Sequence, residues 1–434
     1  MEFSPSLKRF PWMEFTLCVF LGLAVIALFH PGLMTNDSIL QYDQALHGQF
    51  SDAHPPLMSA LWRLLNTIVA GPMGMLIFHV ILFFTGLFLL VDSQAVSRPV
   101  RLMAIVGITF WPAVFTQLGV IWKDVGLSTS FFLACGLLAN NRLPRGRVGL
   151  AGLFLFYGVS VRHNAWPAAL PLCAWGVDTY WPQMKWRLQK LLRLLAVVGT
   201  LVGLQVLTSL VLPVTPSYFG QVIWINDLIG LSVQTHETLL PATSLRPGVR
   251  WEDVVKAYRS EDIDTLRPFV ALTRDPQELH QLRHRWLSAL GHHPYLYVVH
   301  RWNGFHQWIG LGTETVMNPY EDQMWANPWN FHFDAPIAFR HLYHYFYLWR
   351  DSFIFRGWVY LLCNFVLCGW AWRLGRRGAV LWVSLSGLCY GMGYFFYGVS
   401  GDFRYLYWTV MTVFISAWGM IGPEPDAEHT EAGV

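Results

Sequence analysis

Long apolar stretches, separated by short polar segments, follow one another along most of this chain. A helix needs about 20 mainly apolar residues to cross a bilayer. Stretches of roughly this length cover residues 13–31, 72–91, 101–120, 125–140, 148–162, 165–181, 193–213, 354–373, 379–399 and 404–421. The pattern predicts an all-α polytopic membrane protein with about 10 transmembrane helices.

The breaks between these stretches alternate in charge. Arginine and lysine gather at every second break, in the clusters Lys8-Arg9, Arg98/Arg101, Arg142/Arg145/Arg147, Lys185/Arg187/Lys190/Arg193 and Arg373/Arg376/Arg377. Basic clusters in short loops mark the cytoplasmic side of a membrane. We therefore expect both termini in the cytoplasm and the other breaks on the opposite, outer side.

Two of the expected outer regions are long. Residues 32–71 contain a helical pattern at 38–48, with Asp37 or Ser38 as its cap. A second pattern begins at Pro55, a residue that suits the first turn of a helix. Both patterns are amphipathic, so we expect both helices to lie at the membrane surface.

The second long region is a polar insert rich in Trp, Tyr and His, with helical patterns at 251–260, 276–290 and 294–309. Its low share of small apolar residues predicts a cap that rests on the membrane bundle. We expect four divisions: an N-terminal bundle (1–213), this insert (214–353), the C-terminal membrane helices (354–421) and an acidic tail (422–434).

Composition narrows the class of protein further. The chain is 54% hydrophobic and only 13% charged, whereas soluble proteins average about 25% charged residues. The net charge is only +3, and the basic residues are divided among short loops. No nucleic-acid partner is therefore expected. All six cysteines lie in apolar segments without zinc-ligand spacing.

Polar motifs gather in the expected outer loops. They are TNDS and DAHPP in the first loop, followed by WKD, RHN and GDFRY at later breaks. The candidate site residues from these loops are Asp37, Asp43, Asp52, His54, Lys123, Asp124, Arg162, His163, Asn164, Asp402, Arg404 and Tyr405. Because all the loops are expected on one side, these residues are candidates for a single site.

The chemistry of this set favours an anionic ligand. Charges at membrane depth are costly unless they face a polar cavity or a partner, and Arg162 beside His163 suits a phosphate. Asp37 is a candidate general base, and the carboxylates leave a divalent metal such as Mg²⁺ or Mn²⁺ open as a cofactor. Simpler roles also stay open: a cap for Asp37, a solvated helix face for Asp43, a turn for His54, headgroup contacts for the cations, and an internal Asp402–Arg404 pair.

The order of these motifs resembles a known family. An Asp early in the first outer loop, a downstream HPP, a WKD turn, an RHN turn and a terminal DFRY are similar to the motifs of bacterial GT-C-type glycosyltransferases. This superfamily includes the protein mannosyltransferases and the lipid A aminoarabinose transferases. WLSALGHHPYLYVVHRWNGF in the insert also resembles a segment of such proteins. The resemblance covers the whole predicted topology.

The resemblance implies a GT-C-like fold with a periplasmic helical cap, placed in the bacterial inner membrane with its site facing the periplasm. It implies inverting transfer of a sugar from a polyprenyl-phosphate donor in the membrane lipid to a glycan, lipid or protein acceptor. Asp37 matches the family's catalytic acid, and the other candidates would bind substrate. The paired acids of several branches are absent, since Asn36 precedes Asp37, so metal dependence stays open.

Two other functions stay open as well. A transporter or flippase of a lipid-linked anion would share the cationic site but would not need Asp37 as a base. Such a protein needs discontinuous helices and two gates, whereas an enzyme needs a carboxylate near both the lipid phosphate and an acceptor opening. A purely structural partner would leave the clustered motifs unexplained.

Overall fold

The structure is a computed structural model that describes residues 10–184, 187–313, 316, 318–375 and 378–421. Each predicted apolar stretch lies in a helix or a pair of helices. These are α1 (Trp12–Phe29), α4 (Met73–Asp92), α5 (Arg98–Thr109), α6 (Pro112–Leu118), α7 (Lys123–Ala139), α8 (Gly146–Val161), α9 (Trp166–Tyr180), α10 (Arg187–Val211), α16 (Gly357–Arg373), α17 (Ala379–Tyr397) and α18 (Tyr407–Ile421). The all-α fold class is confirmed.

Four of the described helices, α1, α4, α10 and α17, are long and apolar enough to cross a membrane. The bent pair α5 and α6 makes a fifth if it counts as one span. Only 6% of the apolar window of α10 is buried. Such an extended apolar surface is unusual on a soluble monomer and suits contact with a membrane. By length and composition, these helices are compatible with a membrane-embedded protein, and the count of ten crossings stays a prediction.

The predicted span 101–120 is broken into two helices, so its expected continuity was wrong. α5 ends at Thr109, α6 begins at Pro112, and the two helices meet at 63°. Proline cannot donate a backbone hydrogen bond, and the residue before it avoids the helical region. Trp111 is accordingly extended, with ψ at 123°. Every residue of α6 is buried.

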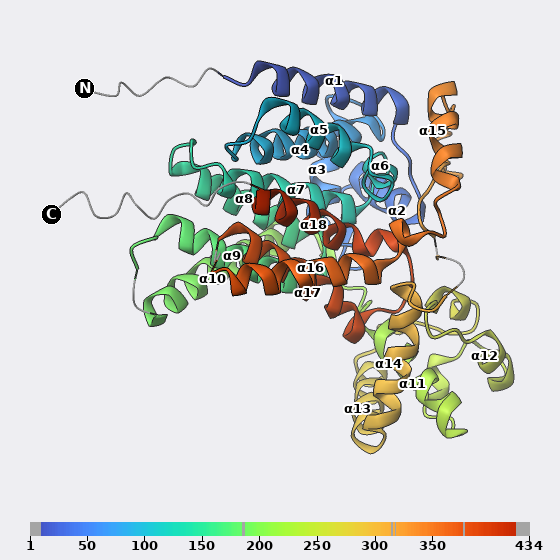
Figure 1. Ribbon diagram of the computed structural model, residues 1–434. Coiled ribbons are helices and arrows are strands. Elements are labelled where there is room, and N and C mark those ends of the chain that lie inside the picture. Colours follow the sequence, from blue (N-terminus) through green and yellow to red (C-terminus); the bar gives the residue numbers. More distant parts are fainter. Residues whose placement is uncertain (1–9, 185–186, 314–315, 317, 376–377, 422–434) are drawn as a thin grey trace, which may run out of the picture.

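The centre of the bundle is α7, which packs against α4, α8, α9, α17 and α18. Every residue from Asp124 to Leu138 is buried. α4 and α7 approach closely where Gly136 faces Gly86. A Cβ atom on Gly136 would lie only 2.7 Å from the Gly86 oxygen, so a larger residue would not fit there. The first described turn of α1 and the last turn of α18 lie at the left end of this bundle in Figure 1.

The first outer loop folds into α2 (Asn36–His47) and α3 (Pro56–Asn66), as predicted. The cap of α2 is Thr35, however, and not Asp37 or Ser38. The Thr35 N–H donates to Ser38 Oγ at 3.3 Å, which is half of a capping box. Asp37 therefore lies inside the first helical turn, and its carboxylate has another use. β1 (Phe50–Ser51) follows α2 and pairs in parallel with β2 (Val214–Thr215).

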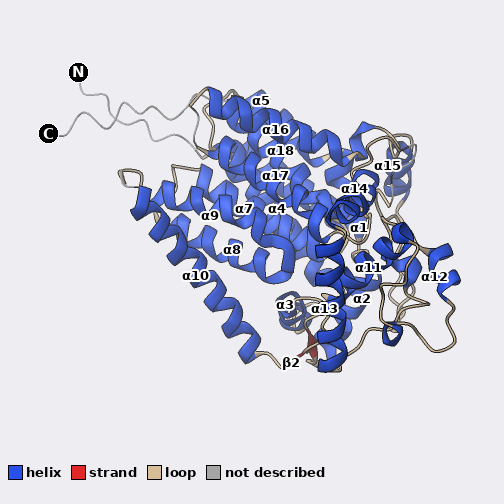
Figure 2. Cartoon of the chain, turned by 90° about the horizontal axis from the view of Figure 1, so that it is seen from below, coloured by secondary structure: helices blue, strands red, loops and turns tan. Residues whose placement is uncertain are grey.

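The insert forms a lobe at one end of the bundle (Figures 1 and 2). Its helices are α11 (Gln221–Thr235), α12 (Trp251–Ala257), α13 (Pro276–His292) and α14 (Pro294–Trp308), and α15 (Ile337–Tyr347) follows them. The sequence patterns predicted α12, α13 and α14 but missed α11 and α15. α11 supplies much of a small apolar core whose buried residues all come from the insert, and Val399 of the bundle packs against it. Phe305 and the residues around α15 join the bundle core instead.

Short 3-10 turns connect several of these elements. They are η1 (His163–Ala165), η2 (Ala242–Ser244), η3 (Ile263–Leu266), η4 (Phe353–Phe355) and η5 (Phe403–Leu406). η1 joins α8 to α9, and η5 leads into α18. The RHN motif at η1 and the GDFRY motif at η5 therefore both lie at a junction between two bundle helices.

Candidate functional site

One carboxylate oxygen of Asp37 lies between two cations from distant parts of the chain. Arg404 Nη1 lies 3.1 Å and Lys123 Nζ 3.7 Å from Asp37 Oδ2. The three side chains are only 11 to 19% exposed. The TNDS, WKD and GDFRY motifs therefore meet at one point.

Backbone contacts bring α2 and α7 together at this point. The segment before α7 pairs with the segment before α2 through the Leu33–Val120 bridge. Ser38 Oγ donates to the Ile121 oxygen at 2.5 Å, and Trp122 Nε1 donates to Thr35 Oγ1 at 2.8 Å. The first turn of α2 is thus fastened to the start of α7, which fixes Asp37 beside Lys123.

A second ion pair lies deeper in the same cluster. Arg162 Nη1 donates to Asp124 Oδ2 at 2.8 Å, and Arg162 Nη2 donates to Tyr394 Oη at 2.5 Å. The Arg162 guanidinium also lies over the Tyr405 ring at 4.7 Å. Both charged residues are buried, so each compensates the other where water cannot. Lys123 and Asp124, though adjacent, serve different partners.

The last polar motif holds Arg404 with two carboxylates. Arg404 Nε donates to Asp402 Oδ2 at 3.0 Å while Nη1 contacts Asp37. Its guanidinium lies over the rings of Trp122 and Tyr405 at 4.8 and 4.9 Å. The internal Asp402–Arg404 pair and the contact with the first outer loop are therefore both present.

The two histidines of the motifs lie near the cations. His54 Nδ1 is 2.7 Å from Lys123 Nζ, so the ammonium donates to a neutral imidazole. His163 Nε2 is 2.8 Å from the Asp52 carbonyl oxygen. The Asp52 carboxylate in turn accepts hydrogen bonds from the backbone and the hydroxyl of Ser217. His163 and Asp52 thereby connect α8, the first outer loop and the start of the insert.

Lys123 and Arg162 line a cavity of about 660 Å³, whereas Asp37 and Arg404 lie behind its wall, in contact with Lys123 or with each other. Its wall combines charge and aromatic rings, and includes Asp52, Lys123, Arg162, His163, Asn164, Tyr218, Phe219, Tyr394, Tyr397 and Tyr405. A neighbouring cavity of about 340 Å³ is lined by α3, α8 and α10 and shares Pro55 and His163 with the first. The polar cavity is therefore adjacent to the exposed apolar helix α10.

The protonation states of Asp37, His54 and His163 follow from these contacts. Burial alone would raise the pKa of the Asp37 carboxyl, but Lys123 and Arg404 outweigh it and hold that pKa well below its usual range. Burial and the Lys123 ammonium lower the pKa of His54 to about 3. Burial also lowers the pKa of His163. At neutral pH the first carboxyl is ionised and both imidazoles are neutral.

Most of the predicted residues converge, and one does not. Asp43 lies on the exposed side of α2 and pairs with His47 at 3.3 Å. This is the solvated helix face that stayed open as its alternative, and the expected substrate-binding role has no geometric support. Among the described residues, no group of three or more His, Cys, Asp or Glu side chains is arranged to hold a metal ion.

Sequence reasoning named Tyr405 but missed the other aromatic residues of the site. Tyr394 holds Arg162, stacks on Tyr405 with centroids 5.5 Å apart, and packs against Trp308 at 4.3 Å. It belongs to the run YFFYG at the end of α17, two residues before the GDFRY motif. That position next to a charged motif was the available signal.

Comparison of the chain with protein-family models, with curated proteins and with solved structures finds no match. The geometry of the site and the pattern of the sequence are therefore the basis for a functional interpretation.

Proposed function

We propose that this protein is an integral-membrane glycosyltransferase that moves a sugar from a polyprenyl-phosphate donor to an acceptor hydroxyl at the outer face of a bacterial inner membrane. The observation that carries the proposal is the Asp37 carboxylate held between Lys123 and Arg404, beside a large cavity of mixed cationic and aromatic character. A base candidate and phosphate-binding cations are both needed for this chemistry, and both are present within one cluster.

The cations of the cluster suit the charge change of the reaction. The donor is a phosphodiester with one negative charge. When the bond between the anomeric carbon and the phosphate oxygen breaks, the leaving polyprenyl phosphate keeps the electron pair and gains a second negative charge. Lys123 and Arg404 would stabilise that charge as it develops. Lys123 and Arg162 both line the cavity where the phosphate would lie.

Asp37 would act as the general base. The acceptor oxygen forms the new bond to the anomeric carbon from the opposite side, and its proton passes to the Asp37 carboxylate, which inverts the anomeric centre. In the free protein the two cations make Asp37 a weak base. A donor phosphate that draws Lys123 and Arg404 toward itself would raise the basicity of Asp37. Donor binding would thus prepare the base.

The aromatic rings around the cavity suit the remaining parts of the substrates. Tyr218 and Phe219 of the insert and Tyr397 at the end of α17 line the cavity, where flat rings could pack on a sugar face. The neighbouring cavity along α10 contains Val206 and Leu210, and both residues are exposed. This apolar groove supports a route by which a lipid tail reaches the bilayer while its phosphate stays with the cations.

The proposal includes a GT-C-like arrangement with ten membrane crossings and both termini in the cytoplasm. Four long apolar helices, the broken pair α5 and α6, and the exposed face of α10 support a membrane setting. The lobe that contains α11 to α14 lies at the opposite end of the bundle from the first turn of α1 (Figure 1), as a periplasmic cap would.

The test is incubation of the purified protein in nanodiscs with a panel of radiolabelled polyprenyl-phosphate sugars and a membrane extract as the source of acceptors. We expect label in a new product that has lost the polyprenyl phosphate, with the opposite anomeric configuration. An Asp37→Asn variant serves as the matched control. Unchanged donor moving across the bilayer of a proteoliposome, without any new product, would support a transporter and contradict the proposal.

A further inference from the structure

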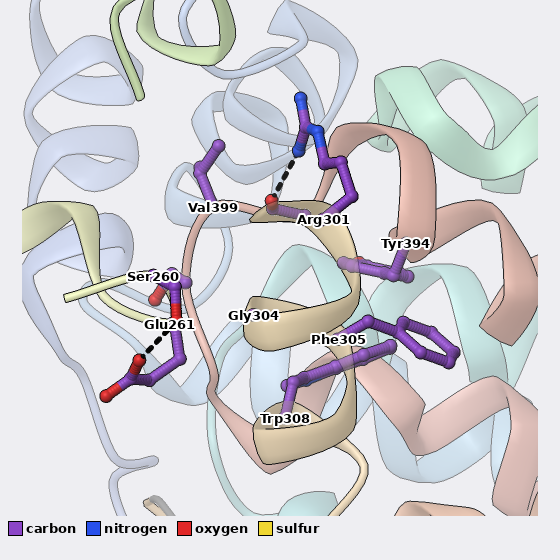
Figure 3. Close-up of a pocket in the computed structure, with 10 residues that line it drawn as sticks. Ser260, Glu261, Arg301, Gly304, Phe305, Trp308, Tyr394 and Val399 are labelled. Atoms are coloured by element: carbon purple, nitrogen blue, oxygen red, sulfur yellow. Dashed lines mark hydrogen bonds between the residues drawn. The ribbon is translucent and has the colours of Figure 1, made fainter. Parts of the chain in front are cut away.

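One face of α14 connects the insert to the loop that carries Arg404. Arg301, Gly304, Phe305 and Trp308 recur at helical spacing on this face, and Figure 3 shows three of their side chains around a small cavity beside Tyr394 and Val399. A Cβ atom on Gly304 would lie 2.7 Å from the Ser260 oxygen. Only glycine allows the helix to approach this closely. The cavity itself measures about 10 Å³, so the face is tightly packed.

Arg301 is anchored inside the insert by a buried carboxylate. Arg301 Nη2 donates to Asp227 Oδ2 at 2.8 Å, and Trp286 Nε1 donates to the same oxygen at 2.8 Å. His300 Nε2 lies 3.1 Å from the other oxygen, Asp227 Oδ1. Asp227, His300 and Arg301 are at most 3% exposed. The carboxylate thus fixes the orientation of the guanidinium.

The second arm of the same guanidinium reaches the bundle. Arg301 Nη1 donates to the Gly398 carbonyl oxygen at 2.9 Å, directly after α17 (Figure 3). The following residues are held from the insert as well. The Ile263 N–H donates to the Val399 carbonyl oxygen at 2.8 Å. Trp308 Nε1 donates to the backbone carbonyl oxygen of Asp402 at 3.0 Å.

The residues held in this way form one wall of the site. Gly398, Val399 and Ser400 line the cavity of about 660 Å³. Asp402, at the end of the segment, accepts a hydrogen bond from Arg404 Nε, and Arg404 pairs with Asp37. A shift of this segment would therefore move both the cavity wall and the cation that faces Asp37.

We propose that Arg301 is a positioning residue that holds the segment 398–402, and through it Arg404, in the geometry that the reaction needs. The guanidinium is suited to this task because its two terminal nitrogens bond in two directions at once, to Asp227 in the insert and to Gly398 on the bundle. The insert therefore contributes to the site through α14, without contact between Arg301 and a substrate. The effect on catalysis rests on the proposed function, whereas the effect on the segment does not.

The test uses Arg301→Lys in the full-length protein. A lysine keeps the charge opposite Asp227 but has a single nitrogen, so it cannot replace both bonds. Hydrogen–deuterium exchange of peptides that cover residues 398–406 should become about tenfold faster, while α11 to α13 exchange as in the wild type. Trp308→Phe, which keeps a ring against Tyr394 but loses the bond to Asp402, should loosen the same peptides. Arg246→Lys is the control, because Arg246 Nε donates to the Val270 oxygen within the insert.

Two results would overturn the inference. One is exchange of residues 398–406 within twofold of the wild-type rate in both variants. The other is equal loosening throughout α11 to α14, since Arg301 would then only stabilise the insert. In the transferase assay, Arg301→Lys should lower turnover about tenfold with an unchanged melting temperature. A wild-type protein without transferase activity would refute the proposed function, and the exchange rates would still decide the role of Arg301.

Discussion

Arg404 Nη1 lies 3.1 Å from Asp37 Oδ2, so the GDFRY segment near the end of the chain contacts the TNDS segment near its start. Residues more than 360 positions apart in the sequence share one ion pair, and Lys123 joins it from the start of α7. The arrangement gives Asp37 two counter-ions in the free protein. Any anion that enters the site must compete with this carboxylate for the same two cations.

The first prediction concerns the role of Asp37. Asp37→Asn keeps the shape of the side chain and removes its charge, and the helix retains its cap because Thr35 supplies it. Turnover should fall by at least about 100-fold, the lower range for loss of a general base. Binding of polyprenyl phosphate should persist or tighten, because Lys123 and Arg404 lose a competing anion. Steady-state transfer rates and a direct binding measurement check both effects.

Asp43→Asn is the matched control on the same helix. Asp43 is exposed and pairs only with His47 among the described residues, so we expect wild-type turnover. Equal activity of the Asp37 and Asp43 variants would show that Asp37 is a counter-ion and not a base. Asp124 and Asp402 would then be the remaining carboxylates of the cluster.

A second prediction concerns the buried pair of Arg162 and Asp124. Arg162→Ala should strongly destabilise the protein, since loss of one partner leaves a buried charge without compensation, at a cost of about 3–5 kcal/mol. The double variant Arg162→Gln with Asp124→Asn removes both charges and should recover most of the melting temperature. It should not recover donor binding if Arg162 also contacts the phosphate. Thermal unfolding and donor affinity separate the two roles, and wild-type donor affinity in the double variant would limit Arg162 to a structural role.

The helices were largely predictable from the sequence because burial in a membrane or a bundle imposes long apolar runs. The convergence of Asp37, Lys123 and Arg404 was predictable from the common side of their loops. The exposed position of Asp43 could have been predicted from helix geometry. Asp43 is six residues from Asp37, so it lies roughly 120° away around α2, on a different face of the helix. Tyr394 could not be singled out, because an aromatic residue in an apolar run has the same pattern whether it faces lipid or a guanidinium.

The third prediction concerns acid stability. His54 is held neutral in the folded protein, with a pKa of about 3, whereas an unfolded chain has a histidine pKa of about 6.5. As the pH falls from about 6.5 toward 3, His54 becomes protonated in the unfolded state but not in the folded state. The protein therefore loses stability over this range. His54→Asn removes this titration, so the melting temperature should fall less steeply between about pH 7.5 and about pH 4.5. His47→Asn, at an exposed position of α2, is the control for the substitution itself, and its melting temperature should fall more steeply with pH than that of His54→Asn.

The last prediction concerns which face of the membrane the site occupies. Single cysteines are introduced at Gln49, Arg259 and Gly146, all of which are exposed. A Cβ atom at Gly146 meets nothing within 4 Å, so this substitution should fit without strain. Gln49 and Arg259 lie in the first outer loop and the insert, and a membrane-impermeant thiol reagent should label both in intact cells once the outer membrane is permeabilised. Gly146 lies within the basic cluster Arg142/Arg145/Arg147, so Gly146→Cys should react only after the inner membrane is lysed. The reverse labelling pattern would place the Asp37 cluster at the cytoplasmic face, where soluble nucleotide sugars, and not polyprenyl-phosphate sugars exposed on the outer face, would be the available donors.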